Sequence, residues 1–206
     1  MQNFDLQQLA QFMAEKSLPQ ADMCLMRVGV DDVHGALKFV FGLPAVSLHL
    51  NMFGYDDEEL NDEVMKLAMN PAVSAFITLD KSQAGGVHEK KLLAADQATP
   101  EGLRAFGTSF AVGQSGTHSI SHTKGGTLDG VLAFEGSTNW SADGEGTFVM
   151  KGAPGGPRYK AQNNTLVFFN NQYFVHLFET ELAREHAVAV AQVQKTPAPN
   201  SVGTQK

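Results

Sequence analysis

The sequence predicts an α/β fold with a largely parallel central β-sheet. Over the first 80 residues, short apolar segments of strand length alternate with segments of helical periodicity. This alternation is typical of strands that are joined by helical crossovers, which place neighbouring strands parallel. The length of 206 residues is sufficient for one well-buried domain and short for two.

In the first half of the chain, acidic residues mark the expected helix starts. Asp31 and Asp32 precede one helix, and an acidic run that begins at Asp56 opens the next, which Pro71 ends. Acidic side chains at a helix N-terminus accept hydrogen bonds from free N–H groups and interact favourably with the helix dipole. The expected strands cover residues 23–30, 46–53 and 72–79, and the expected helices run to residues 41 and 69.

The second half is less regular, and residues 84–116 have the weakest pattern. Expected helices lie around residues 90–93, 99–106 and 172–190, and expected strands cover residues 110–112, 131–134 and 165–169. The last helix carries an apolar stripe that indicates the face it buries. The stripe consists of Phe174, Leu177, Phe178, Leu182 and Ala183.

Composition limits the classes of partner. The apolar fraction of 43% and the charged fraction of 18% are ordinary for a globular protein. The net charge of −7 argues against broad, non-specific binding to nucleic acid or to anionic membranes, which extended basic faces usually drive. A local basic groove remains compatible with this charge.

The compartment is expected to be the cytoplasm. Cys24 is the only cysteine, so no intrachain disulfide can form, and its apolar neighbours place it in a strand of the core. Residues 1–20 carry a helical apolar stripe and lack both a basic start and a continuous apolar stretch. No run approaches the length of a membrane span, so we expect no stable membrane insertion.

Polar residues with the capacity for catalysis are concentrated between residues 122 and 145. They are His122, Lys124, Asp129, Ser137, Asn139 and Glu145. In a strand, residues two apart face the same way, which predicts that His122 points with Lys124, and Ser137 with Asn139. Residues 131–134 form an apolar strand between the two pairs, so adjacent strands would bring all four to one rim. Asp129 is expected either to orient a histidine or to brace the loop.

This set of residue types suits a phosphodiester. Phosphoryl transfer requires positioning and stabilisation of charge on the equatorial oxygens. Lys124 supplies a positive charge, and Ser137 and Asn139 supply hydrogen-bond donors. His122 can attack phosphorus as a neutral imidazole and form a phosphohistidine. Glu145 can hold the second ring nitrogen and select the tautomer.

The pattern H-x-K-x4-D, then six residues, then G-S-T-N, then a glutamate six residues past the asparagine, resembles the motif of the phospholipase D superfamily. Three other segments agree with this family: Phe53-Gly54 before an acidic helix, residues 79–83 after a strand, and residues 162–164 before the last strand. The alternative is a histidine and a lysine on an exposed strand beside ordinary turn residues. The several matching parts of the motif favour the resemblance.

The resemblance implies an α/β fold with a central mixed, largely parallel β-sheet flanked by helices on both faces. It covers roughly residues 20 to 190. We therefore expect an N-terminal helical extension (1–20), a phospholipase D-like catalytic domain (21–192) and a disordered C-terminal tail (193–206).

Many superfamily members carry the motif twice, whereas this chain carries it once. Similarity to single-motif members, including small bacterial endonucleases, implies a homodimer with a shared active site, in which one His122 attacks and its symmetry mate protonates the leaving oxygen. The two imidazoles would then titrate as a coupled pair. The resemblance implies no cofactor and no metal ion.

Four residues after the motif are candidates for substrate binding. Lys151, Arg158 and Lys160 lie in a glycine- and proline-rich stretch without acids, which is either a loop that follows a phosphate backbone or a solvated hairpin. The family places a segment like that of Asn164 near the site.

Three functions remain open. The first is a metal-independent phosphodiesterase acting on DNA or RNA, as in the single-motif endonucleases. The second is a phospholipid headgroup hydrolase or transferase, and the third is a non-catalytic phosphate-binding scaffold. The single motif and the lack of a basic amphipathic membrane-binding stretch favour the first.

Overall fold

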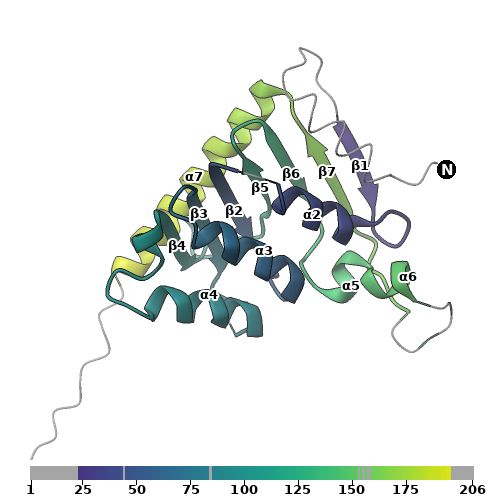
Figure 1. Cartoon of the computed structure of the whole chain (residues 1–206), viewed down its shortest axis with the longest axis horizontal. Coiled ribbons are helices and arrows are strands. Elements are labelled where there is room, and N and C mark those ends of the chain that lie inside the picture. Colours follow the sequence, from purple (N-terminus) through teal and green to yellow (C-terminus); the bar gives the residue numbers. More distant parts are fainter. Residues whose placement is uncertain are drawn as a thin grey trace, which may run out of the picture.

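A seven-stranded mixed β-sheet organises the chain, as the computed structural model in Figure 1 shows. The structure describes residues 23–43, 45–83, 85–152, 154, 156 and 159–195. The predicted N-terminal extension lies outside these residues, as does the predicted tail beyond residue 195. Residues 193–195, which the predicted tail includes, belong to the last helix.

The strands follow the order β1-β7-β6-β5-β2-β3-β4. They are β1 (Met23–Arg27), β2 (Ser47–Met52), β3 (Ser74–Asp80), β4 (Thr108–Gly113), β5 (Lys124–Leu128), β6 (Leu132–Gly136) and β7 (Thr165–Phe169). The predicted α/β fold with a mixed sheet is confirmed. Its predicted, largely parallel character is wrong: only β2–β3 and β3–β4 are parallel, and the other four pairs are antiparallel. The short connection between β5 and β6 permits only antiparallel pairing, because a parallel neighbour needs a long crossover.

Helices cover both faces of the sheet, as predicted (Figure 1). They are α2 (Val33–Phe41), α3 (Glu58–Ala68), α4 (Val87–Gln97), the 3₁₀ turn η1 (Gly102–Phe106), α5 (Ala142–Glu145), α6 (Thr147–Lys151) and α7 (Gln172–Lys195). The α2 and α3 helices pack on one face, and α7 crosses β2, β3, β4 and β5 on the other. Asp32 and Asp57 cap α2 and α3 by accepting hydrogen bonds from the N–H groups of Gly35 and Leu60.

Side chains of β2 that point to opposite faces of the sheet enter two different environments. Leu48 and Leu50 are fully buried in the apolar core under α2 and α3. Asn51 faces the opposite side and donates a hydrogen bond to the Leu182 carbonyl of α7. The core on the α2 side contains packed aromatic rings. The ring of Phe41 contacts those of Phe134 and Trp140 at centroid distances of 5.6 and 5.3 Å. Burial of each such side chain contributes about 1.5–3 kcal/mol.

The buried stripe of α7 differs from the predicted one. Val175, Leu182, His186 and Ala189 are buried, while the predicted core residues Phe174 and Leu177 are 57% and 49% exposed. Ala183 is exposed as well. A stripe chosen for apolar residues alone overlooks His186, whose two ring nitrogens hydrogen-bond to Thr78 on β3 and Ser109 on β4.

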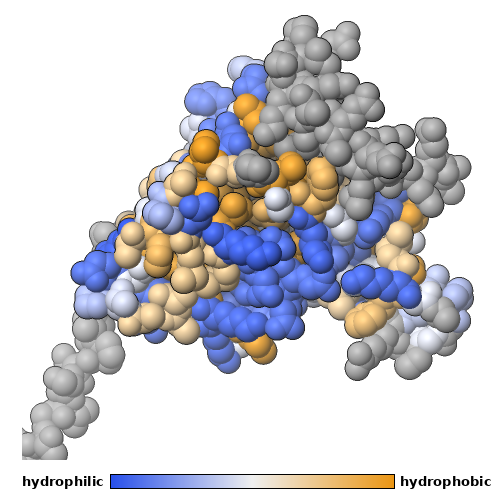
Figure 2. Space-filling model, in the orientation of Figure 1, coloured by the Kyte–Doolittle hydropathy of each residue, from blue (hydrophilic) through white to orange (hydrophobic). Residues whose placement is uncertain are grey.

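Among the described residues, no helix covers the β1–β7 end of the sheet on the α7 side. Met23 and Leu25 of β1 are 73% and 61% exposed, and their β7 partners Phe169 and Val167 are half-buried. On the opposite face, Figure 2 shows hydrophilic residues gathered over α3, whose acidic start is solvent-exposed. None of the helices in the described ranges combines the length and the apolar character that crossing a bilayer requires.

The burial of His186 predicts a loss of stability in mild acid. Burial, and then the nearby His49, lower the pKa of His186 from 6.5 to about 4. Between these values the unfolded chain binds a proton that the folded chain does not bind. The free energy of unfolding should therefore fall as the pH decreases through this window, by up to about 3 kcal/mol.

Chemical denaturation at intervals across this window measures the effect. The variant His186→Gln should show a flatter profile than the wild type. The control His176→Gln, at an exposed position of the same helix, should keep the wild-type profile. An unchanged pH dependence in His186→Gln would contradict the assignment.

Candidate active site

The H-x-K segment enters the sheet at the edge where β2 and β3 end. Lys124 is the first residue of β5 and lies opposite Met52, the last residue of β2. His122 precedes the strand by two residues, and the Phe53 N–H donates to the Thr123 carbonyl at 2.9 Å. This pairing brings the segment against the loop that follows β2.

Phe53 holds both candidate catalytic side chains. Its ring meets the His122 ring edge-on at a centroid distance of 4.6 Å, and the Lys124 Nζ lies 4.9 Å from its centroid. The Lys124 Nζ also donates to the His122 carbonyl at 2.9 Å. An ammonium has three N–H donors, so others can meet an anion. Burial lowers the pKa of Lys124.

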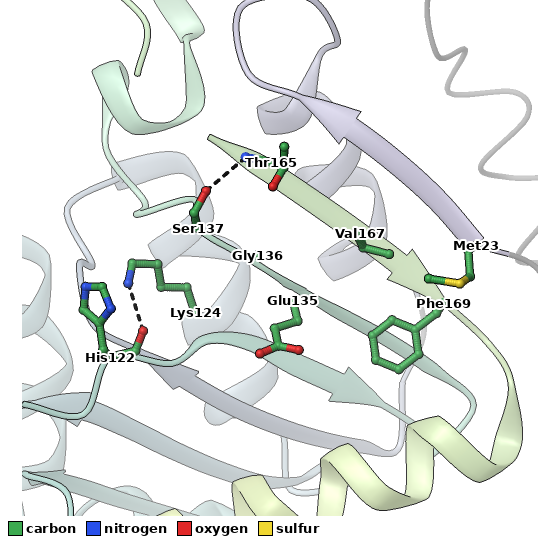
Figure 3. A pocket seen from close by; sticks show the side chains of 9 residues that line it. All are labelled: Met23, His122, Lys124, Glu135, Gly136, Ser137, Thr165, Val167 and Phe169. Atoms are coloured by element: carbon green, nitrogen blue, oxygen red, sulfur yellow. Dashed lines mark hydrogen bonds between the residues drawn. The ribbon is translucent and has the colours of Figure 1, made fainter. Parts of the chain in front are cut away.

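His122, Lys124 and Ser137 open onto one pocket of about 530 Å³ on the α7 side of the sheet (Figure 3). The three side chains lie at one end, and Met23 and Phe169 lie at the other. The Ser137 Oγ accepts a hydrogen bond from the Thr165 N–H at 3.1 Å, which ties β6 to β7. The complete lining is Met23, His122, Lys124, Glu135, Gly136, Ser137, Thr165, Val167 and Phe169.

Glu135 places a carboxyl group between the two ends of this pocket (Figure 3). Burial, and then the nearby Glu185, raise the pKa of Glu135. The pocket therefore contains one ammonium and one carboxyl group rather than a uniformly basic lining.

Asn139 faces a second pocket of about 430 Å³, which Phe53 also lines. The predicted same-facing pair of Ser137 and Asn139 is thus not formed, because β6 ends at Gly136 and strand alternation stops there. The Asn139 Oδ1 is buried and has no hydrogen-bond partner among the described residues. Phe53 lines this second pocket and also contacts His122 and Lys124, which line the first.

Comparison with known proteins identifies the architecture. No protein-family sequence model matches the chain, and no curated protein sequence matches it. Solved structures do match. The phospholipase D family member Nuc from Salmonella typhimurium superimposes with a TM-score of 0.57 at 13% identity, over 81% of this chain and 94% of its own. For NucT from Helicobacter pylori the values are 0.58, 11%, 82% and 98%.

The chain has the phospholipase D fold. A third similar structure, phosphatidylserine synthase from Haemophilus influenzae, has a TM-score of 0.54 at 12% identity, over 81% of this chain and 39% of its own. The fold inferred from the H-x-K-x4-D pattern is therefore confirmed at the level of architecture.

Within this phospholipase D fold, Glu145 does not hold His122. Its Oε2 lies 2.5 Å from the Nδ1 of His34 on α2, and the residue is fully buried. The prediction that Glu145 selects the tautomer of His122 is wrong, because α5 carries it away from β5 to the α2 side of the sheet. Burial raises the pKa of Glu145 to about 7.

Asp129 braces a turn, which is one of its two predicted roles. It adopts a positive φ of 54°, and its Oδ1 accepts hydrogen bonds from the N–H groups of Val46 and Ser47 at 2.8 and 3.0 Å. It follows the last residue of β5, whereas Lys124 is the first. Asp129 therefore fixes the start of β2 at the end of β5 that lies away from the candidate site.

Three of the four predicted substrate-binding residues, Lys151, Lys160 and Asn164, do not line the pocket of His122. Lys151 ends α6 and lies 3.7 Å from Glu59, and Lys160 is exposed. The Asn164 Nδ2 donates to the Gly144 carbonyl at 3.1 Å, which supports the α5 turn. Arg158 lies outside the described residues.

Two carboxylates that the motif does not include fix the His122 segment. Glu185 on α7 accepts hydrogen bonds from the Thr123 Oγ1 at 2.9 Å and from Asn51 at 2.7 Å. Asp80, at the end of β3, accepts from the Ser121 N–H at 2.5 Å. The spacing of the buried residues along α7 is the sequence signal that could have predicted that Glu185 lies near the sheet.

The close approach of Gly54 to Asn139 gives a testable prediction. A Cβ at Gly54 would lie 2.9 Å from the Asn139 side chain, whereas a Cβ at Gly85, on the same pocket, would meet nothing within 4 Å. Gly54→Ala should therefore lower the free energy of unfolding by about 1–3 kcal/mol and displace Asn139. Chemical denaturation measures this, with Gly85→Ala as the matched control. Equal stability of the two variants would show that Asn139 is not held against Gly54.

Proposed function

We propose that this protein is a metal-independent phosphodiesterase that hydrolyses nucleic-acid phosphodiester bonds through a phosphohistidine. The observation that carries the proposal is the convergence of His122, Lys124 and Ser137 on one pocket at the edge of a phospholipase D fold. A nucleophile, a buried cation and a hydroxyl group in one place are what phosphoryl transfer requires of a protein.

In the proposed reaction, a neutral His122 nitrogen attacks phosphorus while Lys124 and Ser137 stabilise the non-bridging oxygens. The P–O bond to the leaving group breaks, and that oxygen takes a proton from the His122 of a second copy. Water then attacks the phosphohistidine and gives its proton to the same second imidazole. This step breaks the P–N bond and restores both histidines. We assign to Asn139 the binding of the part of the substrate that extends past Phe53 into the second pocket.

A second copy is part of this proposal because the chain has a single H-x-K motif. The exposed apolar residues at the β1–β7 end of the sheet supply a surface for it. Leu25 and Met23 expose apolar side chains on β1, and Phe174 and Leu177 expose theirs on the nearby start of α7. A two-fold arrangement would place the α7 of each copy over the open strands of the other and bury both sets.

Phospholipid headgroup hydrolysis is the second candidate, and one observation favours it. Met23, Phe169, Asn171 and Phe174 line an almost wholly apolar hollow of about 340 Å³ next to the catalytic pocket. Such a hollow suits acyl chains. If a second copy covers the same residues, this hollow is closed and the nucleic-acid substrate is favoured. Retention of the fold without catalysis is the remaining alternative.

Replacement of His122 tests the chemistry. His122→Ala should abolish hydrolysis, and Lys124→Ala should lower kcat about 100- to 1,000-fold, as expected for loss of one donor to the transition state. Turnover should be measured on labelled single- and double-stranded DNA, RNA and phosphatidylcholine in excess EDTA. His176→Ala, at an exposed position of α7, is the matched control.

Undiminished activity of His122→Ala, or activity that EDTA removes and Mg²⁺ restores, would overturn the proposed mechanism. Hydrolysis of phosphatidylcholine without hydrolysis of DNA or RNA would select the second candidate. Absence of hydrolysis on all four substrates would favour the third function, a non-catalytic phosphate-binding scaffold.

The open half-sheet gives a separate prediction on assembly. Leu25→Lys places a charge in the proposed interface, so it should convert a dimer to a monomer and remove hydrolysis while the fold persists. Val87→Lys on α4, whose side chain is 63% exposed compared with 61% for Leu25, should leave the dimer and the activity unchanged. Analytical ultracentrifugation measures the first effect, and circular dichroism checks the fold. A fully active monomer of the Leu25→Lys variant would contradict the shared site.

A further inference from the structure

Three potential metal ligands meet on the α2 side of the sheet, outside the three pockets described above. They come from three elements: His34 from α2, Asp57 from the N-cap of α3, and Glu145 from α5. Their ligating atoms all lie within 4.8 Å of one another. His34 is 4% exposed and Glu145 is fully buried.

The hydrogen bonds of this cluster are incomplete. The His34 Nδ1 faces the Glu145 Oε2 at 2.5 Å and the Asp57 Oδ2 at 3.5 Å. The second carboxylate oxygen of Glu145, Oε1, is buried and has no hydrogen-bond partner among the described residues. Buried carboxylate oxygens are normally paired, so this oxygen is available to a ligand.

The other nitrogen of His34 is arranged as in metal sites. Its Nε2 lies 3.5 Å from the Oε2 of Glu59, and Lys38 and Lys151 form ion pairs with Glu59. Histidines that bind metals typically donate their second N–H to a carboxylate, which fixes the ring and the tautomer. Here that arrangement leaves Nδ1 to face the two carboxylates.

One separation in the cluster is close to that between two ligands of a tetrahedral ion. Two ligands at typical Zn²⁺ distances of about 2.1 Å lie roughly 3.4 Å apart. The 3.5 Å between His34 and Asp57 fits this value, and the His34–Glu145 pair would open by roughly 1 Å. Charge also favours an ion, because a divalent cation with two carboxylates and a neutral imidazole is neutral overall.

We propose that His34, Asp57 and Glu145 bind one divalent transition-metal ion, with Zn²⁺ as the best match to one imidazole and two carboxylates. The imidazole ligand disfavours Ca²⁺ and Mg²⁺, which prefer oxygen-only sites. The ion links α2, α3 and α5, and α5 follows the segment of Asn139. It is structural, since none of the three ligands lines the pocket of His122.

Metal content and thermal unfolding of the untagged, full-length protein test the site. After EDTA treatment and dialysis, added ZnCl₂ should bind at one ion per chain. At a hundredfold excess over Kd, the unfolding temperature should rise by about 5–10 °C. Glu145→Gln and Asp57→Asn should lose both effects. Asn retains the capacity to cap α3, so Asp57→Asn keeps the helix start while weakening the ligand.

Asp56→Asn is the matched control, because its carboxylate is adjacent in sequence and lies outside the cluster. It should bind Zn²⁺ as the wild type does. If Glu145→Gln does not fold, Asp57→Asn decides the outcome. A wild type that binds no more Zn²⁺ than Asp57→Asn, or an equal rise in unfolding temperature in both, would overturn the proposal and leave a hydrogen-bonded triad.

These readouts are metal content and unfolding, and they do not include turnover. Failure of the metal proposal therefore leaves the proposed phosphodiesterase unaffected. Conversely, loss of hydrolysis in His122→Ala does not bear on the ion. Assays in EDTA should be run well below the unfolding temperature of the chelated protein, so that rate and stability are read separately.

Discussion

The antiparallel pairing of β2 with β5 positions the candidate chemistry. Because Met52 lies opposite Lys124, Phe53 follows β2 directly beside Thr123, which precedes β5. The ring of Phe53 therefore contacts both His122 and Lys124. A slip of one residue in this register would exchange the two faces of β5 and move Lys124 away from the Phe53 ring. Register between two short strands thus determines whether an imidazole and an ammonium share a pocket.

Carboxylates from outside the motif support this arrangement on either side of His122. Glu185 receives hydrogen bonds from Thr123 and Asn51, and Asp80 receives one from Ser121. Hydrogen bonds to charged acceptors are each worth about 1.5–3 kcal/mol, which is enough to hold a segment that has no strand partner of its own. The candidate catalytic residues are therefore placed by residues that take no part in the proposed chemistry.

Local pattern predicted the elements well and their long-range partners less well. The strand at residues 165–169 has the predicted bounds, and the α/β class follows from the alternation of elements. The antiparallel direction of the last strands could not be predicted from the apolar pattern, because strand direction depends on the length of the connections. Glu145 was assigned to the wrong histidine for a related reason. Spacing along the chain cannot show that α5 turns toward α2, where His34 lies 111 residues away in sequence.

The anchoring of Thr123 by Glu185 has a consequence for biosynthesis. The two residues are 62 positions apart, so the ribosome must add the whole of β6, β7 and most of α7 before the anchor exists. At about 5–20 residues per second, this interval lasts roughly 3–12 seconds. During that time the nascent chain carries the His122 segment without its support from α7. We expect the pocket to acquire its final shape only after α7 has been synthesised.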